Sequence, residues 1–219
     1  MRRLPVYLLV DASGSMRGEP LEAVKVGIEA MASSLRRDPY SLETVWLSVI
    51  SFARDVKLLA PLTEISKFTT PELDVPQTSP TNLGEALEFL TQRYDLEVRR
   101  ATKTEKGDWA PLLFIMTDGA PSDVQLYKRM VEKLREYQFG KIAVCAAGNK
   151  SKLESLRKLT NEIYVLETMD QAAFGKFWRW TTLTVSASAV NPRSQTSFSA
   201  AEAEFGEIPP PPSEIDLVR

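Results

Sequence analysis

Three oxygen-bearing side chains directly follow an apolar run near the start of the chain. The run, residues 6–10, has the composition of a buried strand, and Asp11, Ser13 and Ser15 come after it at two-residue steps. Ligands of open α/β sheets bind just beyond the carboxyl ends of the strands. A carboxylate and two hydroxyls are hard oxygen donors, which favour Mg²⁺ or Mn²⁺ over a thiophilic metal. These residues predict a divalent-cation site, although as an isolated motif they also fit a strand-to-helix turn with capping hydroxyls.

Two later segments carry side chains of the same kind. Thr81 lies in the loop before a helix expected from residue 83, and Asp118 follows a second apolar run at 111–116. If the two runs are parallel strands, their carboxyl ends meet at one edge of the sheet. We therefore predict one metal ion held by two carboxylates and three hydroxyls, with water completing a six-fold coordination. The expected ligands are Asp11, Ser13, Ser15, Thr81 and Asp118, and the expected ion is Mg²⁺ or Mn²⁺, with Ca²⁺ less favoured.

The composition argues against catalysis at this site. The 219 residues include no histidine and a single cysteine, Cys145, inside the apolar run 142–146. Mechanisms that pair histidine with serine or cysteine are excluded, as are zinc sites built from histidine or from several thiolates. Both carboxylates of the predicted site would be engaged by the metal, which leaves no general base beside it. We expect a binding module rather than an enzyme, and we expect Cys145 to be a buried strand residue.

One enzyme class also places an aspartate after its first strand. A Mg²⁺-dependent phosphohydrolase of the haloacid dehalogenase type would use Asp11 as its nucleophile. That chemistry needs a second aspartate two residues later as acid and base, and Ser13 stands there. The sequence also lacks the G-x-x-x-x-G-K-[ST] motif of a nucleotide-binding P-loop. The phosphohydrolase is the alternative hypothesis to the binding module.

Apolar runs alternate with amphipathic segments along most of the chain. This order predicts an α/β fold with a doubly wound, mostly parallel six-stranded sheet, one antiparallel edge strand and helices on both faces. Serine, alanine, proline and glutamate dominate the C-terminal part, so we expect a domain at 1–185 and a flexible tail at 186–219. Ser122 and Asp123 are expected to cap the third long helix. Strands are expected at 6–10, 44–52, 56–59, 111–116, 141–147 and 162–166, and helices at 19–37, 83–90, 124–134, 152–159 and 172–180.

Charge and hydropathy limit the classes of partner. The chain has 29 acidic and 27 basic residues, a net charge of -2, which is not the balance of a nucleic-acid-binding domain. No apolar run approaches the roughly 20 residues of a membrane span, and the short N-terminal apolar stretch is unlike a signal sequence. We expect a cytoplasmic protein with protein partners. The charged loop at 99–108, whose four basic residues lie within 99–106, is expected to be solvated, and docking of an acidic or phosphorylated partner is its alternative role.

Three motifs in this order resemble the metal-ion-dependent adhesion site (MIDAS) of von Willebrand factor A (VWA) domains: Asp-x-Ser-x-Ser, a loop threonine and Thr-Asp-Gly. The resemblance covers roughly residues 4–184. The resemblance implies that the five residues named above are metal ligands and that a partner's acidic residue completes the coordination. Pro80 stands where many relatives have glycine. The Met-Thr-Asp-Gly-x-Pro segment and the tryptophan-containing last helix, followed by a serine-rich stretch, resemble the TerY-like proteins of bacterial tellurium-resistance clusters. That likeness implies an adaptor that works with a protein kinase and a metal-dependent serine/threonine phosphatase in a stress response.

Overall fold

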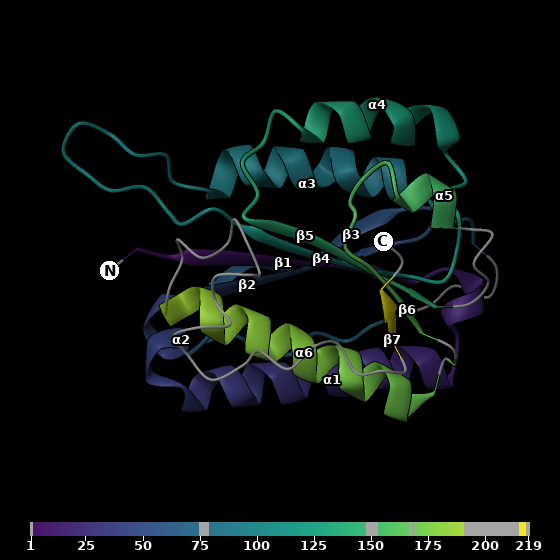
Figure 1. The fold of residues 1–219 in the computed structure, drawn as a ribbon, viewed down its shortest axis with the longest axis horizontal. Helices are drawn as coiled ribbons and strands as arrows, with labels where there is room; N and C mark the ends of the chain where they lie inside the picture. The colour runs from purple at the N-terminus through teal and green to yellow at the C-terminus, as the bar shows by residue number, and fades with distance from the viewer. Residues whose placement is uncertain are drawn as a thin grey trace.

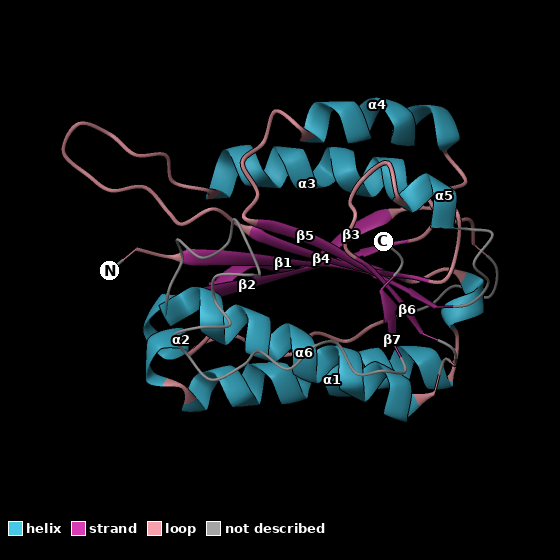
Figure 2. Ribbon diagram, in the orientation of Figure 1, coloured by secondary structure: helices cyan, strands magenta, loops and turns pink. Residues whose placement is uncertain are grey.

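A seven-stranded sheet lies between two layers of helices in the computed structural model of the chain (Figures 1 and 2). The structure describes residues 2–74, 79–147, 153–166, 168, 170–190 and 215–217. The strands are β1 (Leu4–Asp11), β2 (Val45–Phe52), β3 (Val56–Glu64), β4 (Leu112–Thr117), β5 (Lys141–Ala147), β6 (Ile163–Leu166) and β7 (Ile215–Leu217). The helices are the 3₁₀ turn η1 (Gly14–Met16), α1 (Glu19–Arg37), α2 (Pro39–Thr44), α3 (Leu83–Glu97), α4 (Val124–Leu134), α5 (Leu153–Leu156) and α6 (Gln171–Val190).

Strand β1 is at the centre of the molecule and is buried on both faces. The strand order is β3-β2-β1-β4-β5-β6-β7, and β1 pairs in parallel with both β2 and β4. Leu8 and Val10 belong to the core beneath α1 and α6, whereas Tyr7 and Leu9 belong to the core beneath α3 and α4. A strand covered by helices on both faces needs apolar residues at every position, which explains the unbroken apolar run in the sequence.

The predicted fold class is confirmed. The six expected strands are present, with β3 antiparallel to β2 at one edge and helices on both faces (Figure 2). Strand β3 is longer than the predicted 56–59, because it continues through Pro61 to Glu64. Proline lacks the N–H that a central strand needs but is tolerated at a sheet edge, so it does not end this strand.

Two further differences concern helices. Asp38-Pro39 ends α1 as expected, but it also begins α2, because the Asp38 carboxylate accepts a hydrogen bond from the Ser41 N–H at 2.9 Å. Aspartate before a proline at the first helical position is a favourable helix start as well as a helix stop. Helix α6 continues to Val190, so the expected domain boundary at 185 falls inside it. Its later hydroxyls are accommodated locally: that of Thr184, for example, donates to the carbonyl four residues back at 3.0 Å.

The C-terminal segment contributes a strand that was not predicted. Residues 215–217 form β7, which pairs antiparallel with β6 at the edge opposite β3. The proline run at 209–212 lies outside the described residues. The expected assignment of 186–219 to a flexible tail therefore differs from the structure at 186–190 and at 215–217.

The expected burial of Cys145 is confirmed, and four aromatic residues of the last helix belong to the same core. Phe174, Phe177, Trp178 and Trp180 of α6 are buried against the sheet. Cys145 is buried within β5, and this burial raises the pKa of its thiol well above the usual range. A thiol in this state is a packing residue rather than a nucleophile. Among the described helices, none is long and apolar enough to cross a membrane.

Candidate metal site

The pairing of β1 with β4 brings the two candidate carboxylates to one edge of the sheet. Val10 lies opposite Met116 in the parallel ladder, so Asp11 is level with Thr117 and one residue short of Asp118. Asp11 is 0% exposed and Asp118 is 8% exposed. Two largely buried carboxylates are thus neighbours, which is costly unless a positive charge or several hydrogen bonds compensate them.

Asp11 is fixed by hydrogen bonds to both of its carboxylate oxygens. Oδ1 accepts from the backbone N–H of Ser13 at 2.8 Å, and Oδ2 accepts from the Thr117 hydroxyl at 2.6 Å. Burial raises the pKa of Asp11 above its usual value, the hydrogen bonds from Thr117 and Ser13 lower it, and the charge of Asp118 raises it. A divalent cation beside the two carboxylates would reverse this penalty by stabilising both charges.

The turn after β1 places two hydroxyls beside each other. Residues 14–16 form η1, in which the Met16 N–H donates to the Ser13 carbonyl at 3.0 Å and the Met16 side chain is buried. The Ser13 and Ser15 Oγ atoms are 3.2 Å apart. Ser13 is 2% exposed, whereas Ser15 is exposed. The Ser13 hydroxyl therefore lies on the buried side of the site, and the Ser15 hydroxyl lies on the side open to solvent.

The Thr81 loop is attached to its neighbours on both sides. The Thr81 N–H donates to the Ser122 hydroxyl at 3.0 Å, and the Ser122 N–H donates to the Thr81 carbonyl at 2.8 Å. The next residue, Asn82, donates its N–H to the Ala53 carbonyl of the β2–β3 turn at 3.0 Å. A Cβ atom on Gly119 would lie only 3.0 Å from the Thr81 hydroxyl, so this hydroxyl faces the turn that carries Asp118. The structure thus brings all five predicted ligand residues to one edge of the sheet, from three loops.

Comparison with known proteins agrees with this geometry. The sequence model of the von Willebrand factor type A domain matches residues 6–176. The chain belongs to this family. Domains of the VWA family generally act as interaction modules rather than enzymes, and they often use a MIDAS metal site for protein interaction. No curated protein sequence matches the chain.

Solved structures with the same fold are distant in sequence. A von Willebrand factor type A protein from Catenulispora acidiphila is 14% identical with a TM-score of 0.63, over 85% of this chain and 43% of that one. The proximal thread matrix protein 1 of the mussel byssus, solved with a zinc-occupied MIDAS motif, is 17% identical with a TM-score of 0.55, over 86% of this chain and 46% of that one. BatB from Bacteroides thetaiotaomicron is 18% identical with a TM-score of 0.52, over 84% and 98% of the two chains. The chain spans less than half of the length of the first two, and these likenesses establish the VWA fold.

Three residues that support the VWA site were not predicted in these roles. Thr117 orients Asp11, and Ser122 holds the Thr81 backbone. Asp123 was expected to cap α4, but its carboxylate accepts from the first turn of α3, at 3.0 Å from the Gly84 N–H and 2.8 Å from the Glu85 N–H.

Asp123 caps α3 rather than α4 because the N-termini of these two helices are closely packed. A Cβ on Gly84 would lie 2.5 Å from the Tyr127 backbone nitrogen, so the N-termini of α3 and α4 approach closely only because this residue is glycine. The Asp123 side chain is then nearer to the unpaired N–H groups of α3 than to those of its own helix. Gly84, the second residue of α3, was the available sequence signal for this contact.

The donor set of the site is suited to a hard divalent cation. The described residues contain no group of three or more histidine, cysteine, aspartate and glutamate side chains that could hold a metal, so hydroxyls must complete any coordination. Two carboxylates and three hydroxyls fit Mg²⁺ or Mn²⁺ and carry no soft ligand for a thiophilic ion. An ion with few charged ligands keeps much of its electrophilic character and can accept a further anionic oxygen.

Proposed function

We propose that this protein is a non-enzymatic, metal-dependent protein-binding domain. Its five oxygen ligands hold Mg²⁺, or Mn²⁺ in its place, and an acidic side chain of a partner protein completes the coordination. The observation that supports this most is the pair of largely buried carboxylates, Asp11 and Asp118, at the carboxyl edge of β1 and β4 with the hydroxyls of Ser13, Ser15 and Thr81 around them. The exposed Ser15 marks the open side, from which a partner carboxylate would approach.

The residues around Asp11 favour docking over phosphoryl transfer. Asp11 is buried and accepts one hydrogen bond at each carboxylate oxygen, which leaves a lone pair on each oxygen for a metal ion but supplies no acid or base beside it. The position two residues later, where the phosphohydrolase needs an acid, is Ser13. Hydrolysis of p-nitrophenyl phosphate that disappears in an Asp11→Asn variant is the result that would favour the enzyme.

The cellular role is proposed from the sequence resemblance. As a TerY-like VWA adaptor, the protein would act in the cytoplasm in a tellurium-resistance or stress response, together with a protein kinase and a metal-dependent serine/threonine phosphatase. Affinity purification with and without EDTA, followed by mass spectrometry, tests this assignment. Recovery of a kinase or a phosphatase only in the metal-loaded sample is the expected outcome.

Metal titration tests the site itself. Isothermal titration calorimetry with Mg²⁺ and Mn²⁺ should give one binding event in the wild-type protein and none in Asp11→Ala or in a Ser13→Ala/Ser15→Ala double variant. Asp55→Ala is the matched control, because it removes an exposed carboxylate from the β2–β3 turn at the same edge of the sheet. Unchanged metal affinity in the site variants, with melting temperatures equal to that of the control, would refute the proposed site.

A further inference from the structure

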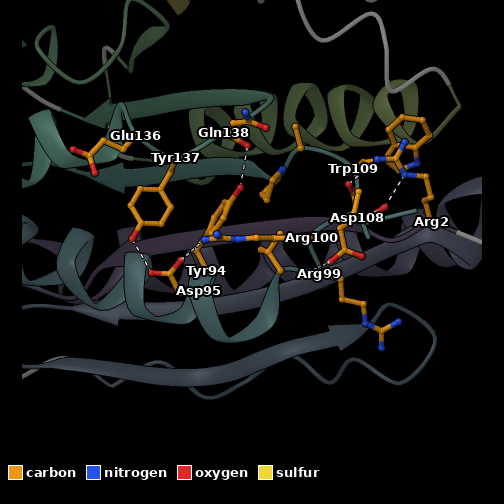
Figure 3. A pocket seen from close by; sticks show the side chains of 15 residues that line it. Arg2, Tyr94, Asp95, Arg99, Arg100, Asp108, Trp109, Glu136, Tyr137 and Gln138 are labelled. Carbon is orange, nitrogen blue, oxygen red and sulfur yellow. Dashed lines mark hydrogen bonds and ion pairs between the residues drawn. The ribbon is translucent and has the colours of Figure 1, made fainter. Parts of the chain in front are cut away.

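A concave surface lies at the opposite end of the sheet from the metal site. Its volume is about 800 Å³, and it is lined by the start of the chain, the last turn of α3, the loop from α3 to β4 and the segment after α4 (Figure 3). Strand β1 separates the two ends: its first and last residues are about 23 Å apart at 3.3 Å per residue. We call this concavity, together with the loop at 99–106, the basal surface. An ion at the metal site and the side chain that coordinates it would not cover this surface.

The basal surface is held in place by a buried ion pair. The Arg3 guanidinium donates to both carboxylate oxygens of Asp108, at 2.9 and 2.6 Å, and both side chains are largely buried. Asp108 also accepts from the Arg99 N–H at 2.8 Å, and its own N–H donates to the Arg99 carbonyl at 2.8 Å. These bonds close the base of the loop. A bidentate arginine–carboxylate pair is geometrically specific, so the walls around the concavity are ordered before any partner arrives.

Aromatic rings form the walls of the concavity. Arg2 lies over the Trp109 ring with its guanidinium carbon 3.7 Å from the centroid, and it donates to the carbonyls of Gly107 and Asp108 (Figure 3). On the other side, Tyr94 and Tyr137 meet edge to face with centroids 5.0 Å apart. Rigid rings of this kind are common anchoring surfaces at protein interfaces, because they give a large contact area for little loss of side-chain freedom.

The loop that rims the concavity carries a positive charge. Residues 99–106 are all exposed and contain four basic residues and one acidic residue, Glu105. Arg100 pairs with Asp95 at 3.1 Å, whereas the side chains of Arg99, Lys103 and Lys106 form no ion pair with any part of the chain that the structure describes. Figure 1 shows this loop extending away from the body of the domain. Its charge is therefore available to a molecule that approaches this end.

An exposed apolar side chain lies three residues before this loop in the sequence. Leu96, in the last turn of α3, is 76% exposed, more than any other large apolar residue among those described. A basic loop beside rigid rings and an exposed leucine complements a segment that combines acidic residues with an aromatic or aliphatic side chain. Opposite charges across an interface accelerate association and select the partner, while the buried ring supplies most of the affinity.

We propose that the basal surface docks an acidic peptide segment of a partner protein that carries an aromatic residue. The carboxylates of the segment lie along Lys103 and Lys106, and its ring enters the concavity between Trp109 and Tyr137. With the metal site at the other end, the domain holds two partners at once. Docking at the basal surface does not depend on the proposed function, because this surface contains no candidate metal ligand; only the simultaneous binding of two partners rests on it.

The test uses the full chain and a fluorescent peptide in EDTA, so that the metal site takes no part. The probe is a twelve-residue peptide with four glutamates and one phenylalanine, followed by fluorescence anisotropy at low salt. The Lys103→Glu/Lys106→Glu variant should bind at least tenfold more weakly than the wild type. Lys128→Glu/Arg129→Glu, which makes the same charge change on the exposed face of α4, should bind within twofold of the wild type. A probe with serine in place of phenylalanine should bind at least fivefold more weakly.

Several results would overturn the proposal. The first is that the wild-type protein does not bind the peptide, and the second is that both double variants lose the same peptide affinity. The third is that the probe without phenylalanine binds as tightly as the probe with it. The last is that single-stranded DNA of the same charge binds as tightly as the peptide. The last result would identify the loop as a general polyanion site. A failure of metal titration at the carboxyl edge would leave all of these measurements unaffected, so the two proposals fail separately.

Discussion

Removal of the Asp123 carboxylate should destabilise the start of α3. That helix has no side-chain cap of its own, since Asn82 forms none, and Asp123 supplies acceptors to two of its first N–H groups from another element. Loss of a capping acceptor lowers the free energy of unfolding by about 0.5–2 kcal/mol. Loss of a negative charge beside a helix N-terminus lowers it by about a further 0.3–1 kcal/mol. We expect Asp123→Ala to lower the free energy of unfolding by about 2 kcal/mol. For a protein of this size that is a fall of roughly 4–8 °C in Tm.

Urea unfolding and amide hydrogen exchange together measure this effect. Asp123→Asn keeps one acceptor oxygen and should lose about half as much stability, on the order of 1 kcal/mol. Glu29→Ala, which removes an exposed acid from α1, is the control and should change little. Exchange should accelerate at the amides of Gly84 and Glu85. Acceleration confined to the amides of Gln125 and Leu126 would instead assign the cap to α4 and refute the reasoning.

Four further substitutions test the packing and the electrostatics of the domain. Gly27→Ala should lower the free energy of unfolding by about 2 kcal/mol, because a Cβ there would lie 1.9 Å from Trp178. An overpacking penalty of about 3 kcal/mol exceeds the helix-propensity gain of about 1 kcal/mol. Gly175→Ala is the control: nothing lies within 4 Å of its Cβ, so it should stabilise the protein in the same denaturation assay. Gly119→Ala should weaken Mg²⁺ binding in calorimetry and barely change Tm, since its Cβ would lie 3.0 Å from the Thr81 hydroxyl. Burial raises the pKa of Asp11 in the folded state above its ordinary value near 4. Between these two pKa values the folded state keeps a proton that the unfolded state releases. The free energy of unfolding of the metal-free protein should therefore fall as pH rises through this window. Asp11→Asn should flatten this slope in EDTA and be more stable than the wild type at pH 7; a steeper slope would contradict the assignment.

The elements of the fold were largely predictable because each depends on nearby residues. The apolar run of β1 and the three- and four-residue spacing in α1 are properties of neighbouring positions, and both elements appear where the pattern placed them. The pattern was less informative where one residue serves two purposes. Asp38 ends one helix and caps the next, and Pro61 continues an edge strand that the same residue would interrupt at the centre of a sheet.

The sequence by itself predicted the types of candidate ligand and the three loops that carry them. It also excluded histidine chemistry, since the chain has no histidine. Only the tertiary structure decided which groups surround those ligands, because the supporting contacts join residues far apart in the chain. Thr117 reaches Asp11 across 106 positions, and Asp123 reaches Gly84 across 39. Such contacts depend on strand order and on how closely two helix ends approach, which no local pattern encodes. The same holds for the basal surface, where Arg2 meets Trp109 only after β1 and β4 have paired.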